Sequence, residues 1–228
     1  MQRSTIIILI LIQLLISCDF RTPEEYYDLA YDKIAIGNCS EAIDLLDKAI
    51  QKRPEFRPGL LQRGFCKMEM QQDLDAIKDF DTILTFDPGN TLTLFNLGIC
   101  YYNLSEYAKS IQYFSMAMQT VGSNSNDTVQ IELQLLSDVD NDSNYLLYEN
   151  EIRFERGCSF AKNGEFEKAI DDFNNVLSTN YKEAECYYWM GYSSMGLTDS
   201  IQACQYFSRS ADLGWKESKD ELKQICSK

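Results

Sequence analysis

The chain has 228 residues, of which 45% are hydrophobic and 12% aromatic, and this composition excludes a disordered protein. Its formal net charge is -14 and no basic stripe is visible, so nucleic acid is excluded as an expected partner. Anionic lipid headgroups are almost as unfavourable a partner, for the same reason. Histidine is absent, which removes the commonest general base and metal ligand. We therefore expect no enzyme, no cofactor and no small-molecule substrate, and we interpret Asp171-Asp172 as a solvated helix face.

Residues 1–17 have the features of a signal peptide. Arg3 gives a positive start, and the apolar run 6–16 is too short to span a bilayer, because a spanning helix needs about 20 apolar residues. Residues 15–18, Leu-Ile-Ser-Cys, resemble the bacterial lipobox, which implies that Cys18 is lipidated and becomes the amino terminus. Two alternatives stay open: a secretory cleavage that leaves Cys18 as an ordinary thiol, and an amino-terminal core helix.

A short tether, residues 18–22, leads to the first predicted helix. Thr22 is a suitable N-cap, Pro23 suits the first helical position, and Glu25 is placed to complete a capping box. Because so few residues separate Cys18 from this helix, the folded part of the chain is expected to lie close to the membrane surface.

A register of 34 residues organises the rest of the chain. A small residue is followed twelve positions later by Ala or Ser, and four positions after that by a large apolar residue. This spacing is typical of two closely packed antiparallel helices. The small residues are Ala30, Gly64, Gly98, Gly157 and Gly191, and the large residues are Leu46, Phe80, Phe114, Phe173 and Phe207.

The pattern resembles the tetratricopeptide repeat, in which helix A carries the small residue and helix B the large one. The resemblance implies an all-α fold, a right-handed α-solenoid of about five repeats. They would occupy residues 23–56, 57–90, 91–124, 150–183 and 184–213, followed by a capping helix at 214–228. Gly122 and Tyr181 replace the usual terminal proline in the third and fourth repeats, and Ala30 replaces glycine in the first.

An insertion, residues 125–149, separates the third and fourth repeats. Apolar and polar residues alternate over 129–135, which favours a β-hairpin or an extended arm, although an extension of the flanking helices is the alternative. Asp138, Asp140, Asp142 and Glu149 approach the spacing of an EF-hand calcium loop, but Ser143 stands where that loop needs glycine. We interpret the segment as an acidic turn and keep a calcium-responsive module as an alternative function.

Cysteine use is compatible with export. Eight cysteines minus a lipidated Cys18 leave an odd number, so at least one thiol is free. The fifth B helix and the capping helix should run antiparallel, which would bring Cys204 opposite Cys226 and allow a disulfide. Cys66 and Cys100 are interpreted as small core residues.

The resemblance also implies a ligand-binding surface along the A helices. Carried onto this chain, the family's ligand-facing positions form an aromatic stripe, although aromatic residues there also serve packing. The predicted groove residues are Tyr27, Tyr31, Leu61, Phe65, Phe95, Asn96, Ile99, Tyr102, Phe154, Tyr188, Trp189 and Tyr192.

The sequence therefore predicts a non-catalytic scaffold or adaptor for protein–protein interaction. Its partner would be a protein or peptide segment in the bacterial cell envelope. The chain would be exported and lipid-anchored, with the periplasmic face of the outer membrane favoured over the inner membrane.

Overall fold

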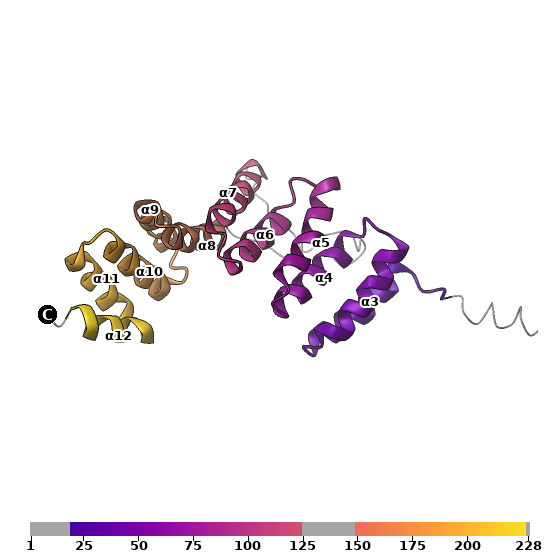
Figure 1. Ribbon diagram of the computed structural model, residues 1–228, viewed down its shortest axis with the longest axis horizontal. Coiled ribbons are helices and arrows are strands. Elements are labelled where there is room, and N and C mark those ends of the chain that lie inside the picture. Colours follow the sequence, from indigo (N-terminus) through magenta and orange to yellow (C-terminus); the bar gives the residue numbers. More distant parts are fainter. Residues whose placement is uncertain (1–18, 125–148, 227–228) are drawn as a thin grey trace, which may run out of the picture.

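The computed structural model describes residues 19–124 and 149–226, whose regular structure is entirely helical. Cys18 and most of the insertion lie outside these residues. The helices form a single row of antiparallel pairs (Figure 1), as the predicted α-solenoid requires. The A helices are α2 (Pro23–Ala35), α4 (Arg57–Glu69), α6 (Thr91–Asn103), α8 (Glu149–Lys162) and α10 (Glu183–Gly196). The B helices are α3 (Cys39–Lys52), α5 (Asp73–Phe86), α7 (Tyr107–Asn124), α9 (Phe166–Leu177) and α11 (Ser200–Asp212). Helix α12 (Lys216–Ile225) follows the last B helix.

The first helix begins as its sequence predicts. The Glu25 N–H donates to Thr22 Oγ1 at 3.2 Å, and the Thr22 N–H donates to Glu25 Oε2 at 2.8 Å. Pro23 occupies the first turn, where no N–H is needed. The capping box is therefore confirmed, and it fixes the point at which the tether ends.

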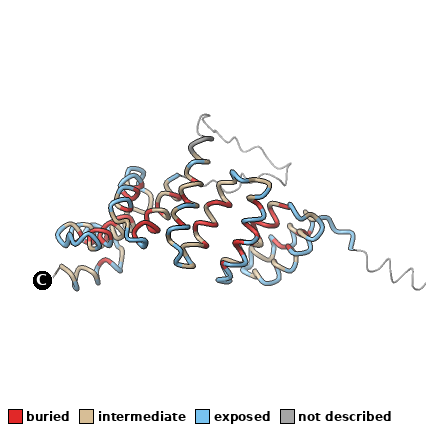
Figure 2. The backbone as a smooth tube through the Cα atoms, turned by 45° about the horizontal axis from the view of Figure 1, so that its top comes forward, coloured by how far each residue is buried: buried red, intermediate tan, exposed pale blue. Residues whose placement is uncertain are grey.

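In the second to fifth repeats, each helix pair is closed by the packing of a phenylalanine against a glycine. A Cβ atom placed on Gly64 would lie 2.5 Å from the ring of Phe80, and one on Gly98 would lie 2.6 Å from the ring of Phe114. In the first repeat, the larger Ala30 takes the place of the glycine and packs with the smaller Leu46 in place of the phenylalanine. Both residues are fully buried. Buried residues accordingly run through the whole row of helices (Figure 2).

A second pair of positions, sixteen residues apart, joins helix A to helix B. Arg63 binds Asp79 through two hydrogen bonds of 3.0 and 2.5 Å, and Arg156 binds Asp172 through two of 2.8 Å. Asp172 is only 5% exposed, so the prediction that it lies on a solvated helix face is wrong. Inside the fold, its carboxylate accepts the two hydrogen bonds from the Arg156 guanidinium. The other repeats hold apolar residues at the same two places, which are Leu29 and Leu45, Leu97 and Tyr113, and Met190 and Tyr206.

The insertion interrupts the sequence without separating the neighbouring helices. Helices α7 and α8 pack directly on each other, and the hydroxyl groups of Ser110 and Ser159 are hydrogen-bonded at 2.8 Å. Ile152 of α8 is buried against Phe114 and Ala117 of α7. Helix α7 passes through Gly122 to Asn124, as the absence of a terminal proline permits. The predicted hairpin itself lies outside the described residues.

Every turn between an A helix and its B helix contains one residue with a left-handed backbone. Gly37 and Gly164 suit this conformation, but Gln71, Ser105 and Thr198 also adopt it, with φ values of 59°, 60° and 62°. A β-branched side chain is strained there, at a cost of about 1–3 kcal/mol.

Thr198→Gly is expected to raise the free energy of unfolding by about 1 kcal/mol, because glycine adopts a positive φ without strain. The measurement is urea denaturation followed by circular dichroism. Gly164→Ala, the reverse change at the equivalent turn, should lower the stability. A loss of stability in Thr198→Gly would contradict the strain argument.

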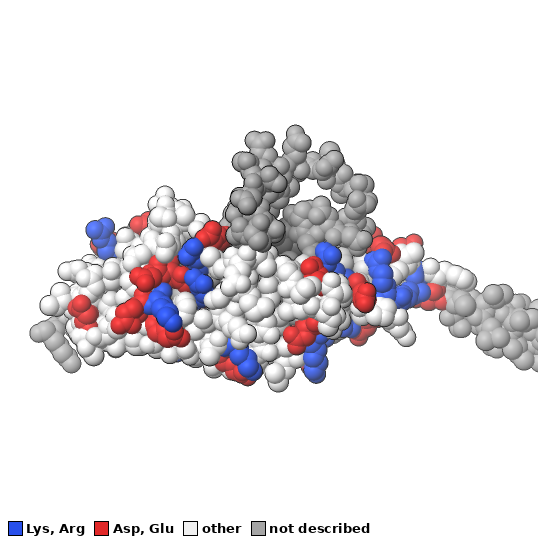
Figure 3. Space-filling view, turned by 90° about the horizontal axis from the view of Figure 1, so that it is seen from above, with Lys and Arg blue, Asp and Glu red and all other residues white. Residues whose placement is uncertain are grey.

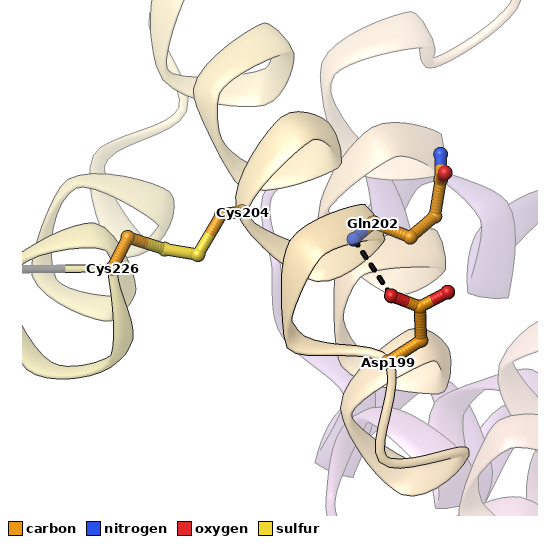
Figure 4. The surroundings of a disulfide bond; sticks show 4 residues. All are labelled: Asp199, Gln202, Cys204 and Cys226. Carbon is orange, nitrogen blue, oxygen red and sulfur yellow. Dashed lines mark hydrogen bonds between the residues drawn. A yellow bond between two sulfur atoms is a disulfide. The ribbon is translucent and has the colours of Figure 1, made fainter. Parts of the chain in front are cut away.

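A disulfide fastens the carboxyl-terminal end of the row. Cys226, which follows α12, is bonded to Cys204 of α11, with 5.7 Å between their Cα atoms (Figure 4). This is the pairing expected from the antiparallel helices. Asp199 caps α11 by accepting a hydrogen bond of 3.0 Å from the Gln202 N–H. The outer face of α12 is polar, as a terminal cap requires. Within residues 19–124 and 149–226, no helix has both the length and the hydrophobicity needed to cross a membrane.

Candidate protein-binding surface

The A helices of neighbouring repeats contact one another, so residues at the same register position form rows across them. The clearest row is made by the residue that follows each small residue. The row consists of Tyr31, Phe65, Ile99, Cys158 and Tyr192. We call this row, together with the predicted groove residues beside it, the A-helix surface.

Three aromatic residues of this row are exposed. Tyr31 is 54% exposed, Phe65 41% and Tyr192 36%, although large apolar side chains usually lose most of their exposure on folding. They belong to three different helices, α2, α4 and α10. Exposed aromatic side chains repeated at one register position favour an interaction surface over core packing.

Most of the other predicted groove residues are partly buried. Tyr27 packs edge-on against Phe56, with ring centroids 5.8 Å apart, and Phe95 packs against Phe114 at 5.5 Å. Leu61 and Phe154 are only 7% and 6% exposed and lie in the core, which corrects their placement on the surface. The half-buried members are Tyr27, Phe95, Asn96, Ile99, Tyr102, Tyr188 and Trp189.

The row of exposed aromatic residues is interrupted at α6, where Ile99 is half-buried, and at α8, where Cys158 is buried. Cys158 is the smallest member of the row and is 4% exposed. Tyr102 of α6 packs against the core cluster that contains Cys158 and Phe154, and burial raises the pKa of its phenol. The A-helix surface is therefore divided into an amino-terminal part, with Tyr31 and Phe65, and a carboxyl-terminal part, with Trp189 and Tyr192.

The carboxyl-terminal part combines aromatic rings with a cation. Trp189 and Tyr192 meet edge to face at 5.5 Å, and the Lys162 ammonium lies 5.3 Å from the centre of the first ring and 5.1 Å from that of the second. Tyr188 packs between Trp189 and Trp215, and burial raises its pKa, as do Glu221 and Glu217 nearby. Rings arranged in this way attract cations through their faces.

The sequence did not predict an ion pair whose lysine lies over the Phe154 ring, 4.3 Å from its centre. Glu155 holds in α8 the position that Asn96 and Trp189 hold in α6 and α10, and it is bonded to Lys182 at 3.2 Å. Burial raises the pKa of the Glu155 carboxyl, and Lys182 opposes part of that shift. The shared register position was the signal that could have identified Glu155.

The predicted calcium ligands cannot be assembled from the described residues. Asp138, Asp140 and Asp142 lie outside them, and Glu149 begins α8 with its carboxylate paired to Arg153. Among residues 19–124 and 149–226, no group of three or more Cys, Asp or Glu side chains is arranged to hold a metal ion.

The helix pairs, their register and the exposed A-helix surface define the class of α-solenoid repeat proteins. Within that class the fold is the tetratricopeptide repeat fold, which solved structures share. The MamA protein superposes with a TM-score of 0.66 at 18% identity, covering 89% of this chain and 94% of MamA. YrrB, described as a tetratricopeptide repeat protein with an unusual peptide-binding site, superposes with a TM-score of 0.68 at 15% identity, covering 88% of this chain and 91% of YrrB.

Sequence comparison finds a relative that is named for the same repeat. Tetratricopeptide repeat protein 1 of Schizosaccharomyces pombe is 25% identical over 195 residues, which are 78% of this chain but only 16% of that relative. The chain thus spans about a sixth of that relative's length. No protein-family model matches the chain.

Proposed function

We propose that this protein is a non-catalytic scaffold that binds a protein or peptide segment on its A-helix surface while a lipid on Cys18 holds it at a bacterial membrane. The observation that carries the binding role is the exposure of Tyr31, Phe65 and Tyr192 at one register position. The peptide-binding site named for YrrB, which has the same fold, supports it by analogy.

The attachment part of the proposal is supported by the sequence. Cys18 follows the apolar run 6–16, and only three residues separate it from the capping box at Thr22. Mass spectrometry of the protein purified from membranes would show a lipid on an amino-terminal Cys18, and Cys18→Ala would lose it. An unmodified Cys18 thiol on a cleaved, secreted chain would contradict the anchor.

Photo-crosslinking tests the binding role. A photoreactive residue replaces Phe65 in the full chain, native membranes are irradiated, and the adducts are identified by mass spectrometry. Ile201 of α11, which is 77% exposed and belongs to a B helix, provides the matched control position. One recurrent partner captured from Phe65 and not from Ile201 would support the proposal.

The double variant Tyr31→Ala/Phe65→Ala is expected to reduce capture of that partner at least tenfold, because a central aromatic anchor contributes about 2 kcal/mol or more to an interface. Because position 65 is then occupied by alanine, capture is compared with and without the double variant from a photoreactive residue at Ile99, in the next A helix. Ile201→Ala should leave the adduct unchanged. Equal capture by the double variant, with an unchanged melting curve, would show that the exposed aromatic residues do not bind the partner.

A further inference from the structure

Two cysteines lie at the junction between the first and the second repeat. Cys39 is the first residue of α3 and is half-buried, whereas Cys66 lies near the end of α4 and is fully buried. Cys39 packs against the core cluster of the first repeat, to which Cys66 also belongs. Burial raises the pKa of the Cys66 thiol, and its hydrogen bond with the Cys39 thiol raises that pKa further. The two sulfur atoms are therefore neighbours in the folded chain.

The register of the repeat explains why these side chains meet. At two other junctions the first residue of a B helix also lies against the end of the next A helix. Asn103 of α6 donates a hydrogen bond of 3.0 Å to the carboxylate of Asp73, which begins α5. The ring of Phe166, which begins α9, packs against Gly196 at the end of α10. Cys39 holds the same place in α3, so the fold brings it to the end of α4.

Other buried cysteines of the described residues have different neighbours. Cys100 holds in the third repeat the place of the α4 cysteine, but burial and the nearby Asp73 carboxylate, to which it is hydrogen-bonded, raise the pKa of its thiol. Cys158 and Cys186 share one core cluster, yet the Cys186 thiol donates a hydrogen bond of 3.7 Å to the main-chain oxygen of Tyr181. The partner of Cys100 and of Cys186 is thus an oxygen atom and not a second sulfur, which sets the first junction apart.

This junction also positions the amino-terminal part of the A-helix surface. Phe65 precedes Cys66 directly on α4, and Tyr31 lies on α2 of the first repeat. An ion pair between Arg63 and Asp47 crosses the junction, but the Asp47 side chain is 53% exposed. Figure 3 shows further Lys and Arg side chains next to Asp and Glu side chains along the row. Exposed ion pairs contribute little to stability, so a covalent bond would connect the two repeats far more firmly.

We infer that Cys39 and Cys66 form a second disulfide in the exported protein, which fastens the first repeat to the second. The bond fixes Tyr31 relative to Phe65 and so preserves the spacing of two exposed aromatic residues of the A-helix surface. The inference rests on the export proposed above, because disulfides persist in oxidising compartments. The chain already carries one such bond at its carboxyl-terminal end.

The oxidant is a protein or small-molecule disulfide of the cell envelope. Cys39 is the more accessible thiol and reacts first: its sulfur displaces one sulfur of the oxidant, which leaves as a thiol with the Cys39 proton. The Cys66 sulfur then displaces the second oxidant sulfur from Cys39, and the Cys66 proton leaves with it. The two cysteines lose two electrons and two protons in all, and the oxidant is reduced to two thiols.

Oxidation of the full chain tests this geometry. The protein purified from membranes is reduced without denaturant and then exposed to oxidised glutathione. The remaining thiols are alkylated in denaturant, and unreduced peptides are identified by mass spectrometry. Cys39 and Cys66 should be joined to each other, and the carboxyl-terminal disulfide should form again. Cys100, Cys158 and Cys186 are the matched controls, and they should be recovered as alkylated thiols.

Variants test whether the register causes the reaction. Asp73→Cys places a thiol opposite Cys100 in the same register as Cys39 and Cys66, so position 73 should become joined to Cys100 under the same conditions. The double variant Cys39→Ser/Ser40→Cys moves the first thiol by one residue, to an exposed position, and should leave Cys66 unpaired.

Amide hydrogen exchange measures what the bond does to the fold. With both thiols reduced, α2 and α3 should exchange fastest. Oxidation should slow exchange in α3 by about 30-fold or more relative to the equally oxidised Cys39→Ser variant, because a disulfide constrains the opened chain. Helix α9, which neither disulfide contains, should exchange at the same rate in both proteins.

The outcomes are distinct. A bond between Cys39 and Cys66, found after oxidation and also in protein alkylated before isolation from the cell envelope, supports the inference. Unpaired Cys39 and Cys66 beside an intact carboxyl-terminal disulfide, in either sample, overturn the inference and leave the proposed scaffold intact. If glutathione oxidises both pairs but both are reduced in the cell, the proposed export fails and the inference fails with it.

Discussion

Replacing Asp172 by alanine is expected to lower the free energy of unfolding by about 3 kcal/mol. The change leaves the Arg156 guanidinium, whose side chain is only 18% exposed, without the carboxylate to which it donates two hydrogen bonds. Removing one partner of a buried ion pair costs this much because the remaining charge stays partly desolvated. Urea denaturation followed by circular dichroism measures the change.

Two further variants show whether the cost comes from the unpaired charge. Asp171 is the exposed neighbour of Asp172, and Asp171→Ala should change the stability by no more than about 0.5 kcal/mol. The double variant Arg156→Met/Asp172→Tyr installs the pair that Met190 and Tyr206 form in the fifth repeat, and it should recover most of the loss. A double variant as unstable as Asp172→Ala would mean that packing, and not the unpaired charge, causes the destabilisation.

Gly64→Ala is expected to destabilise the protein by about 2 kcal/mol, although alanine is normally the better helix former by roughly 1 kcal/mol. The added Cβ would lie 2.5 Å from the Phe80 ring, which is fully buried among other core side chains. The sign of the effect is therefore opposite to that expected from helix propensity alone. The midpoint of urea denaturation gives the sign directly.

The first repeat supplies a compensating change. Ala30 and Leu46 fill in that repeat the places that Gly64 and Phe80 fill in the second, so Gly64→Ala/Phe80→Leu should be more stable than the sum of its two single changes predicts. Gly89 has no atom within 4 Å of the position of an added Cβ, and Gly89→Ala should be nearly neutral. Strict additivity of the two changes would contradict a steric clash between Gly64→Ala and Phe80.

The helix pairs and the disulfide could be predicted because they depend on short-range spacing. The recurrence of a small residue and a large one sixteen positions apart predicts how helix A packs against helix B. The antiparallel arrangement of α11 and α12 could be predicted by extending this packing to the capping helix. The capping box depends only on Thr22 and on Glu25 three positions later, so it could be predicted directly from the sequence.

The exposure of individual surface residues could not be predicted in the same way. Leu61 and Phe154 share a register position with the half-buried Tyr27 and Phe95, yet they are buried, because exposure depends on the size of the side chains on the neighbouring helices. Phe154 is the clearest case, because Tyr102 of the neighbouring α6 packs against the core cluster to which Phe154 belongs. No periodicity in one helix reports the volume of a residue in the next.

The cations around Tyr26 could not be predicted from the sequence either. Lys48 and Lys52 are about 30 residues from Arg21 in sequence. Only the packing of α3 against α2 brings the three side chains to one aromatic ring.

The different covering of the two ends gives the array a direction of unfolding. In a protein whose repeats contact only their neighbours, local opening starts where an interface is missing. Within residues 19–124 and 149–226, the first repeat has a neighbouring repeat on one side only, whereas a disulfide holds α12 to α11 at the other end. Amide hydrogen exchange should therefore be fastest in α2 and α3 and slow progressively toward the middle of the row. A pulling force applied through the amino terminus would peel away α2 and α3 first and leave Trp189 and Tyr192 in place, so the distal part of the A-helix surface would keep its shape under load.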